Sequence, residues 1–199
     1  MAKPADLAAW AGKVSGSGVP VPIVRQELPY TCGPAIMASV LAYFGVVSNE
    51  KDLAEEAGTT PDGTSFDTVA RVLRSHGMEA KFRDDLDPKE IKRLLRYGYL
   101  VVIALQAWDE DVPPLGGYTG EWDSGHYVVP VAVDERSILF QDPAIAGRRA
   151  YLTHQEFLSR WHSEDGDGVY DRGYGLVVKG HGPVLWREFR KLPPPVRMG

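Results

Sequence analysis

The spacing of the hydrophobic residues changes close to Gly98, and this change limits the possible folds more than any other feature of the sequence. Before it, apolar residues recur at the three- and four-residue spacing of helices that bury one face. After it come short runs rich in Val, Ile and Leu, bounded by turn-forming residues, as is typical of strands. Helices followed by antiparallel strands predict an α+β fold.

Glycines and N-capping residues punctuate the helical part. A capping box at Asp87–Glu90, with Pro88 in the first turn, opens one helix, and a second box at Thr153–Glu156 opens another that runs through Trp161. Glycine follows each of the first four helices at the point where a helix commonly ends. The first four predicted helices are Cys32–Phe44, about Glu50–Ala57, a stretch within Ser65–His76, and the helix from Asp87 to Gly98.

Four segments are predicted to be strands: Tyr99–Leu105, His126–Val133, Ser137–Gln141 and Gly173–Gly180. The second and third flank Asp134–Arg136, which is short enough for a hairpin turn. Pro130 cannot donate a ladder hydrogen bond, so it predicts an edge position or a bulge in its strand. We expect one domain over residues 21–190, a loosely ordered segment over 1–20 and an extended tail over 191–199.

Composition excludes several classes of function. A net charge of −5 over 199 residues provides no basic surface for nucleic acid or for an anionic membrane. The single cysteine rules out an internal disulfide and a multi-cysteine metal site, and no two histidines have ligand spacing, so no metal or organic cofactor is expected. There is no apolar stretch of the kind found in signal peptides or membrane spans. We therefore expect a cytoplasmic protein, and the sequence does not predict its oligomeric state.

The single cysteine, Cys32, lies where the chain changes from loop to helix. Free N–H groups and the helix dipole stabilise an anion at such a position, which lowers the pKa of a thiol. Gly33 leaves the backbone beside the sulfur bare, so a substrate could approach it. The alternative is a small buried apolar residue, since free cysteines are usually buried and inert. From this position alone, both interpretations stand.

Three further residues could complete a site for acyl transfer, which requires a base, a group that orients the base and donors for the oxyanion. His126 opens a strand after a glycine-rich loop, and Asp142 follows the second strand of the same hairpin, so both belong to one edge of the sheet. Gln26, six residues before Cys32, could fold back beside the sulfur. Individually they could be a surface histidine, a turn former and a solvated loop residue. Together with Cys32 they fit one mechanism.

Two segments also resemble a known family. QELPYTCGPAIMASVLAYFG and SGHYVVPVAVDERSILFQDPA are similar to the two catalytic blocks of papain-like cysteine peptidases of the bacteriocin-leader (double-glycine) type, in particular their stand-alone relatives without a transporter. The resemblance covers roughly Val21 to Val178. It implies a helical N-terminal part packed on an antiparallel sheet that carries His and Asp.

Carried over by position, the resemblance implies that Cys32 is the nucleophile and His126 the general base and acid. Asp142 would orient the imidazole, and Gln26 would complete the oxyanion hole with the Cys32 N–H.

The segment 106–125 is long for a loop in a small domain, and such loops are often functional. We expect it to act as a flap whose aromatic residues contact substrate and whose carboxylates favour a cationic one; a polar surface loop is the alternative. These carboxylates are Asp109, Glu110, Asp111, Glu121 and Asp123. The candidate substrate contacts are Gly33, Trp108, Trp122, Gly125 and Tyr127.

The sequence thus favours a thiol hydrolase that cleaves an amide or peptide bond through an acyl-cysteine. One alternative is an acyltransferase, in which an amine replaces water at the acyl-enzyme. Another is a non-catalytic binding module on the same scaffold. The expected partner is a peptide or a small amide or acyl substrate.

Overall fold

The computed structural model describes residues 18–107, 117–165, 168–181 and 195–198. Its helices are α2 (Cys32–Tyr43), α3 (Glu50–Ala57), α4 (Phe66–Ser75), α5 (Pro88–Arg96) and α6 (His154–Arg160), with a 3₁₀ turn, η1, at Gly117–Gly120. Its strands are β1 (Glu79–Arg83), β2 (Leu100–Gln106), β3 (Gly125–Val133), β4 (Ser137–Gln141), β5 (Ala150–Thr153), β6 (Ser163–Asp165), β7 (Gly168–Tyr170), β8 (Gly175–Lys179) and β9 (Val196–Arg197).

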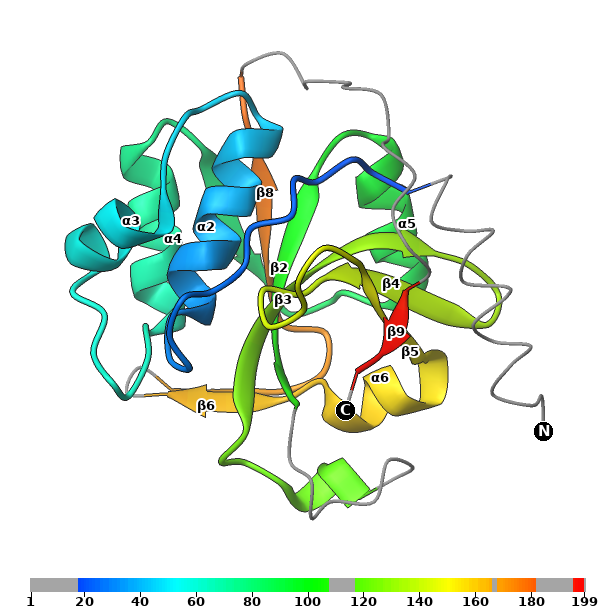
Figure 1. Cartoon of the computed structure of the whole chain (residues 1–199). Coiled ribbons are helices and arrows are strands. Elements are labelled where there is room, and N and C mark those ends of the chain that lie inside the picture. The colour runs from blue at the N-terminus through cyan, green and yellow to red at the C-terminus, as the bar shows by residue number, and fades with distance from the viewer. Residues whose placement is uncertain (1–17, 108–116, 166–167, 182–194, 199) are drawn as a thin grey trace.

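Seven strands form one sheet in the order β1-β8-β2-β3-β4-β5-β9, and β6 pairs with β7 separately. Every pairing in the large sheet is antiparallel except that of β5 with β9. Figure 1 shows α2, α3 and α4 gathered on one side of the molecule and β4, β5 and β9 on the other. The predicted α+β class is confirmed.

Helix α2 lies in the interior, in contact with α3, α4 and β3. Of its 12 residues, 11 are buried, which is more than the single apolar face expected from the sequence. Small residues make this possible: Ala35, Ala38 and Ser39 let neighbouring elements approach the helix closely. The first turn of α2 is therefore fixed from several directions by the core.

The predicted ends of the helices are confirmed to within one or two residues. Asn49, Ser65 and Asp87 cap α3, α4 and α5 through their side chains, and Thr153 and Glu156 form the full capping box of α6. The predicted box at Asp87 is only half formed, because the Glu90 carboxylate pairs with Arg83 and Arg93.

Pro130 lies in the central strand β3, where the register shifts between Pro130 and Ala132. Of the two predicted alternatives for Pro130, an edge position or a bulge, the bulge is therefore correct.

Described residues beyond both predicted domain limits are packed against the domain. In the N-terminal segment, the Val19 N–H donates to Val131 O at 2.7 Å. In the C-terminal tail, β9 adds to the sheet beside β5, and Met198 is 1% exposed. Of the predicted tail, Val196–Arg197 therefore form part of the sheet.

The segment 18–31 connects the sheet to α2 through polar contacts. The Gln26 N–H donates to Pro143 O at 2.9 Å, and Gln141 Nε2 donates to Val24 O at 3.1 Å. The buried Arg149 guanidinium donates to Val21 O and, at 2.6 Å, to Gln141 Oε1. These bonds fix the approach of the chain to Cys32 relative to β4 and the turn after it.

Candidate active site

Cys32 is the first residue of α2 and is 9% exposed. Its position is set by the preceding turn, in which the Thr31 hydroxyl donates to Leu28 O at 3.1 Å. Thr31 therefore makes no side-chain cap, and the first N–H groups of the helix have no partner in the preceding residue's side chain. The sulfur lies beside this helix end, in the place predicted from the sequence.

His126 and Asp142 come together as predicted. His126 lies opposite Leu105 of β2 near the start of β3, and Asp142 directly follows β4. His126 Nε2 lies 2.8 Å from Asp142 Oδ1, and the same oxygen accepts the Ala144 N–H at 2.9 Å. Since the Asp142 carboxylate is fully buried, it holds the imidazole in one orientation.

The His126 imidazole also hydrogen-bonds the Cys32 thiol. Burial alone would raise the pKa of Cys32, but the hydrogen bond and charge of His126, with the N–H groups of Tyr127 and Gly33, lower the pKa below its usual value. Burial would likewise lower the pKa of His126, yet the charge and hydrogen bond of Asp142, followed by Cys32, raise it to about 10. The arrangement therefore favours a thiolate–imidazolium pair at neutral pH.

Gln26 lies near Cys32 in the chain, but its side-chain amide donates to backbone carbonyls and not toward an oxyanion at Cys32. Both hydrogens of its amide nitrogen are used, by Leu28 O at 2.9 Å and Pro29 O at 3.0 Å. The amide oxygen is buried without a partner among the described residues. The oxyanion role of Gln26 stays a prediction, and it requires the amide to leave at least one of these carbonyls.

A cleft of about 360 Å³ opens beside Cys32 and His126. Of the predicted substrate contacts, Trp122, Gly125 and Tyr127 line it. Gly33 does not line it; a Cβ there would lie 3.0 Å from the Thr64 Cβ, so its bare backbone serves packing as well. Trp108, Asp109, Glu110 and Asp111 lie outside the described residues.

The described part of the 106–125 segment behaves only partly as predicted. Trp122 is 36% exposed and lies over the cleft, but Tyr118 is fully buried, with the Arg160 guanidinium 3.7 Å from the centre of its ring. The Glu121 carboxylate is engaged within the loop, where it accepts the Asp123 N–H at 2.8 Å.

Four acidic residues line the cleft, of which only Asp123 was expected there as part of the segment 106–125; the other three are Asp62, Glu164 and Asp165. In the sequence, Asp62 belongs to the turn-forming stretch PDGT, and Asp123 is an alternative to Asp142 that its position in a long loop disfavours. Glu164 and Asp165 are in β6, a strand too short to be seen in the sequence. Only the fold, which brings residues 62–64, 122–127 and 163–165 together, identifies Asp62, Glu164 and Asp165 as neighbours of Cys32.

Other candidates are placed away from the chemistry. Asp134, a second carboxylate at the hairpin of β3 and β4, accepts the N–H groups of Arg136 and Ser137 in the turn. His76 pairs with Glu56 at the end of α4, as expected for a structural residue. Among the described residues, no group of three or more His, Cys, Asp and Glu side chains is arranged to hold a metal ion.

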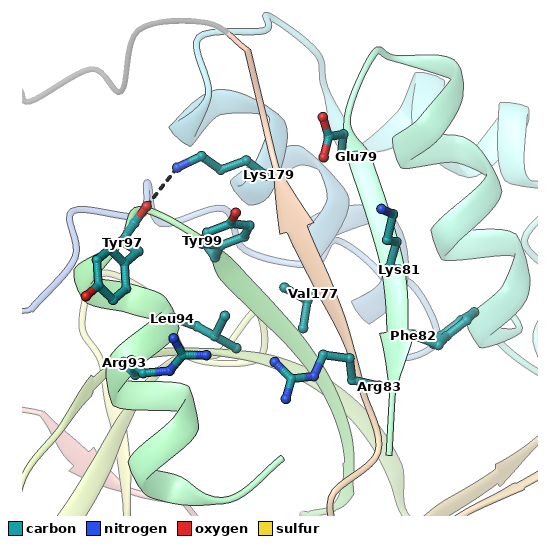
Figure 2. A pocket seen from close by; sticks show the side chains of 10 residues that line it. All are labelled: Glu79, Lys81, Phe82, Arg83, Arg93, Leu94, Tyr97, Tyr99, Val177 and Lys179. Atoms are coloured by element: carbon teal, nitrogen blue, oxygen red, sulfur yellow. Dashed lines mark hydrogen bonds between the residues drawn. The ribbon is translucent and has the colours of Figure 1, made fainter. Parts of the chain in front are cut away.

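A second hollow, of about 690 Å³, lies between α5 and the edge strand β1. Figure 2 shows Arg83 and Arg93 across it and Lys179 donating to the Tyr97 carbonyl at 2.8 Å. The two arginines are paired with Asp85 and Glu90, which balance their charge. It contains no nucleophile, and Cys32 and His126 are not among its lining residues.

The Peptidase C39 family model matches residues 20–164. The chain belongs to the peptidase C39 family. An uncharacterized protein of Methanothermobacter marburgensis is 32% identical over 127 residues, which cover 62% of this chain and 72% of that protein. The resemblance seen in the sequence is thereby confirmed, and a cysteine peptidase-type hydrolase is the activity that the family supports.

Two solved structures share the C39 fold. One is a double-glycine-motif protease from an AMS/PCAT transporter in complex with the leader peptide, with a TM-score of 0.58 and 20% identity over 82% of this chain and 97% of that one. The other is the peptidase domain of Streptococcus ComA, a bi-functional ABC transporter, with a TM-score of 0.58 and 18% identity over 81% of this chain and 99% of that one. No helix among the residues described here is long and apolar enough to cross a membrane.

Proposed function

We propose that this protein hydrolyses a peptide bond through an acyl-Cys32 intermediate, with His126 as acid and base and Asp142 as the residue that orients it. The observation that carries the proposal is the chain of contacts from the Cys32 thiol through the His126 ring to the buried Asp142 carboxylate at 2.8 Å. A peptide is the favoured substrate because a protease of the same fold was crystallised with its leader peptide.

The chemistry follows from this arrangement. The Cys32 thiolate attacks the carbonyl carbon, and the N–H groups at the start of α2 stabilise the oxyanion that forms. His126 then gives its proton to the leaving amine, which departs as the C–N bond breaks and leaves a thioester. The neutral imidazole next takes a proton from water, whose oxygen attacks the thioester. Collapse of the second tetrahedral intermediate releases the acid and restores the thiolate and the imidazolium.

The test uses the full chain and a diverse peptide mixture, with cleavage products identified by mass spectrometry. Wild-type protein is expected to release new termini, and Cys32→Ala and His126→Ala to release none above background. His76→Ala is a matched control, because it removes a histidine paired with a carboxylate on the surface. Products that persist in Cys32→Ala, or a wild-type protein that cleaves none of the mixture, would contradict the proposal.

A further inference from the structure

The cleft beside Cys32 has a strongly acidic wall. Four carboxylates line it, and His126 is the only basic side chain among its described lining residues. Asp165 is already engaged: its Oδ2 accepts the Phe66 N–H at 2.7 Å and its Oδ1 the Tyr170 hydroxyl at 3.0 Å. That carboxylate joins β6 to the start of α4 and shapes the wall.

The other three carboxylates differ from Asp165. Asp62, Asp123 and Glu164 are exposed, and within the part of the chain that the structure describes their carboxylates have no hydrogen-bond or ion-pair partner. They come from three separate segments, namely the turn before α4, the loop before β3, and β6. Like charges that face one cleft repel each other, and a cation between them relieves that repulsion.

Trp122 supplies an aromatic surface on the same wall. Its ring centre lies 4.5 Å from that of His162, which supports it from one side. His162 is 6% exposed, and its Nε2 lies 2.7 Å from Glu121 O. A partly exposed indole beside free carboxylates is a combination that suits ammonium and guanidinium groups, because the ring face attracts cations.

A fully buried glutamine fixes both sides of this wall. Gln106 Nε2 donates to His162 O at 3.2 Å, and Gln106 Oε1 accepts the Ser124 N–H at 2.9 Å. Glu164 lies two residues after His162, and Trp122 and Asp123 directly precede Ser124. The segments that carry Trp122, Asp123 and Glu164 are therefore attached to the sheet at the end of β2, next to the strand that carries His126.

We propose that the cleft selects a cationic substrate, a peptide with a lysine or arginine side chain beside the scissile bond, through Asp62, Asp123, Glu164 and the face of Trp122. The inference deepens the proposed hydrolysis and rests on Cys32 being the reacting group. It concerns the charge of the substrate side chain beside the cleaved bond. Exposed carboxylates act by attracting and orienting a cation, so the effect is expected to weaken with salt.

The first test needs no turnover. As the single cysteine, Cys32 can be labelled with methanethiosulfonates that carry either a trimethylammonium or a sulfonate group. In each case the thiolate forms a disulfide with the reagent and releases methanesulfinate. The ratio of the two rate constants, divided by the same ratio for 2-mercaptoethanol, measures the charge preference of the cleft. We expect a normalised ratio of roughly 10 or more for the wild-type protein at low salt.

The triple variant D62N/D123N/E164Q should bring that ratio close to 1, and the single variants should lower it in part. The matched control is E55Q/D84N/E135Q, which removes three exposed carboxylates outside the cleft and changes the net charge equally. His126 favours the anionic reagent to the same extent in all of these proteins, so its effect cancels. A ratio that is unchanged in D62N/D123N/E164Q, or that falls equally in the control, overturns the inference.

The second test applies to hydrolysis. Paired peptides that differ only in lysine, norleucine or glutamate beside the cleaved bond should rank in that order in kcat/KM, and the triple variant should remove the preference. Cleavage without any charge preference overturns the inference and leaves the proposed hydrolysis intact. Absence of all cleavage contradicts the hydrolysis, while the labelling ratio still decides the selectivity of the cleft.

Discussion

Replacing His126 with alanine should change how the reactivity of Cys32 depends on pH. In the folded protein, burial opposes ionisation of the thiol, and the imidazolium of His126 is the main group that overcomes it and lowers the pKa of Cys32. Because the pKa of His126 is raised to about 10, the imidazolium is present across the neutral range. In His126→Ala the thiol is still buried, but the imidazolium that offsets the effect of burial is absent. The pKa of Cys32 should therefore lie above its ordinary value.

The magnitude follows from the thiolate fraction. A thiol with the ordinary value of 9.0 is about 1% ionised at pH 7, whereas a thiol in a formed ion pair is almost fully ionised. Part of this gain is lost because nucleophilicity falls with pKa, by roughly threefold per unit. Over several pKa units this loss nearly offsets the gain at pH 7, so we expect His126→Ala to react at most a few-fold more slowly at pH 7 and about tenfold more slowly at pH 6.

Iodoacetamide, which is small and uncharged, is the appropriate reagent, with alkylation followed by intact mass between pH 6 and pH 8.5. The wild-type rate constant should be nearly independent of pH, and that of His126→Ala should rise tenfold per pH unit. His76→Ala should retain the flat wild-type profile. A tenfold rise per unit in the wild-type protein would mean that Cys32 is an ordinary thiol, and this would refute the argument from the His126 contact.

Two further substitutions test the groups behind the dyad. Asp142→Asn removes the charge that raises the pKa of His126, so kcat should fall by about 10²-fold or more. The pH above which the alkylation rate leaves its plateau should also become lower. The control E135Q should change neither quantity. The raised pKa of His126 also contributes to the free energy of unfolding. This contribution is complete below the usual pKa of 6.5 and is lost as the pH rises through about 10. In urea titrations, wild type and Asp142→Asn should therefore differ most at pH 6 and least above pH 10. Gln26→Ala should lower kcat by about 10²–10³-fold if its amide reaches the oxyanion, with the alkylation rate unchanged; an unaltered kcat would assign Gln26 to the loop before α2 alone.

The sequence predicted the parts of this protein in which local chemistry decides the structure. Helix ends could be located because capping side chains and glycines act within a few residues. The hairpin of β3 and β4 could be located as well, and with it the pairing of His126 with Asp142, since two antiparallel strands joined by a short turn bring their outer ends together.

Features that depend on distant segments were missed. Strand β1, at Glu79–Arg83, has only a weak alternation of apolar residues and forms because β8, almost a hundred residues later, pairs with it. The acidic wall has no local signature, since Asp62 and Glu164 become neighbours of Cys32 only through the fold. The orientation of the Gln26 amide could not be predicted because it is decided by two backbone carbonyls, which any sequence would provide.

The contacts of the segment 18–31 have a consequence for thermal inactivation. Cys32 is carried by the helical part and His126 with Asp142 by the sheet, and the bonds of Val24 and Gln26 to β4 and its following turn are among those that align the two. Such peripheral hydrogen bonds can open without unfolding the core on either side. Catalytic competence would then disappear in a local transition, below the temperature at which the helices and the sheet melt.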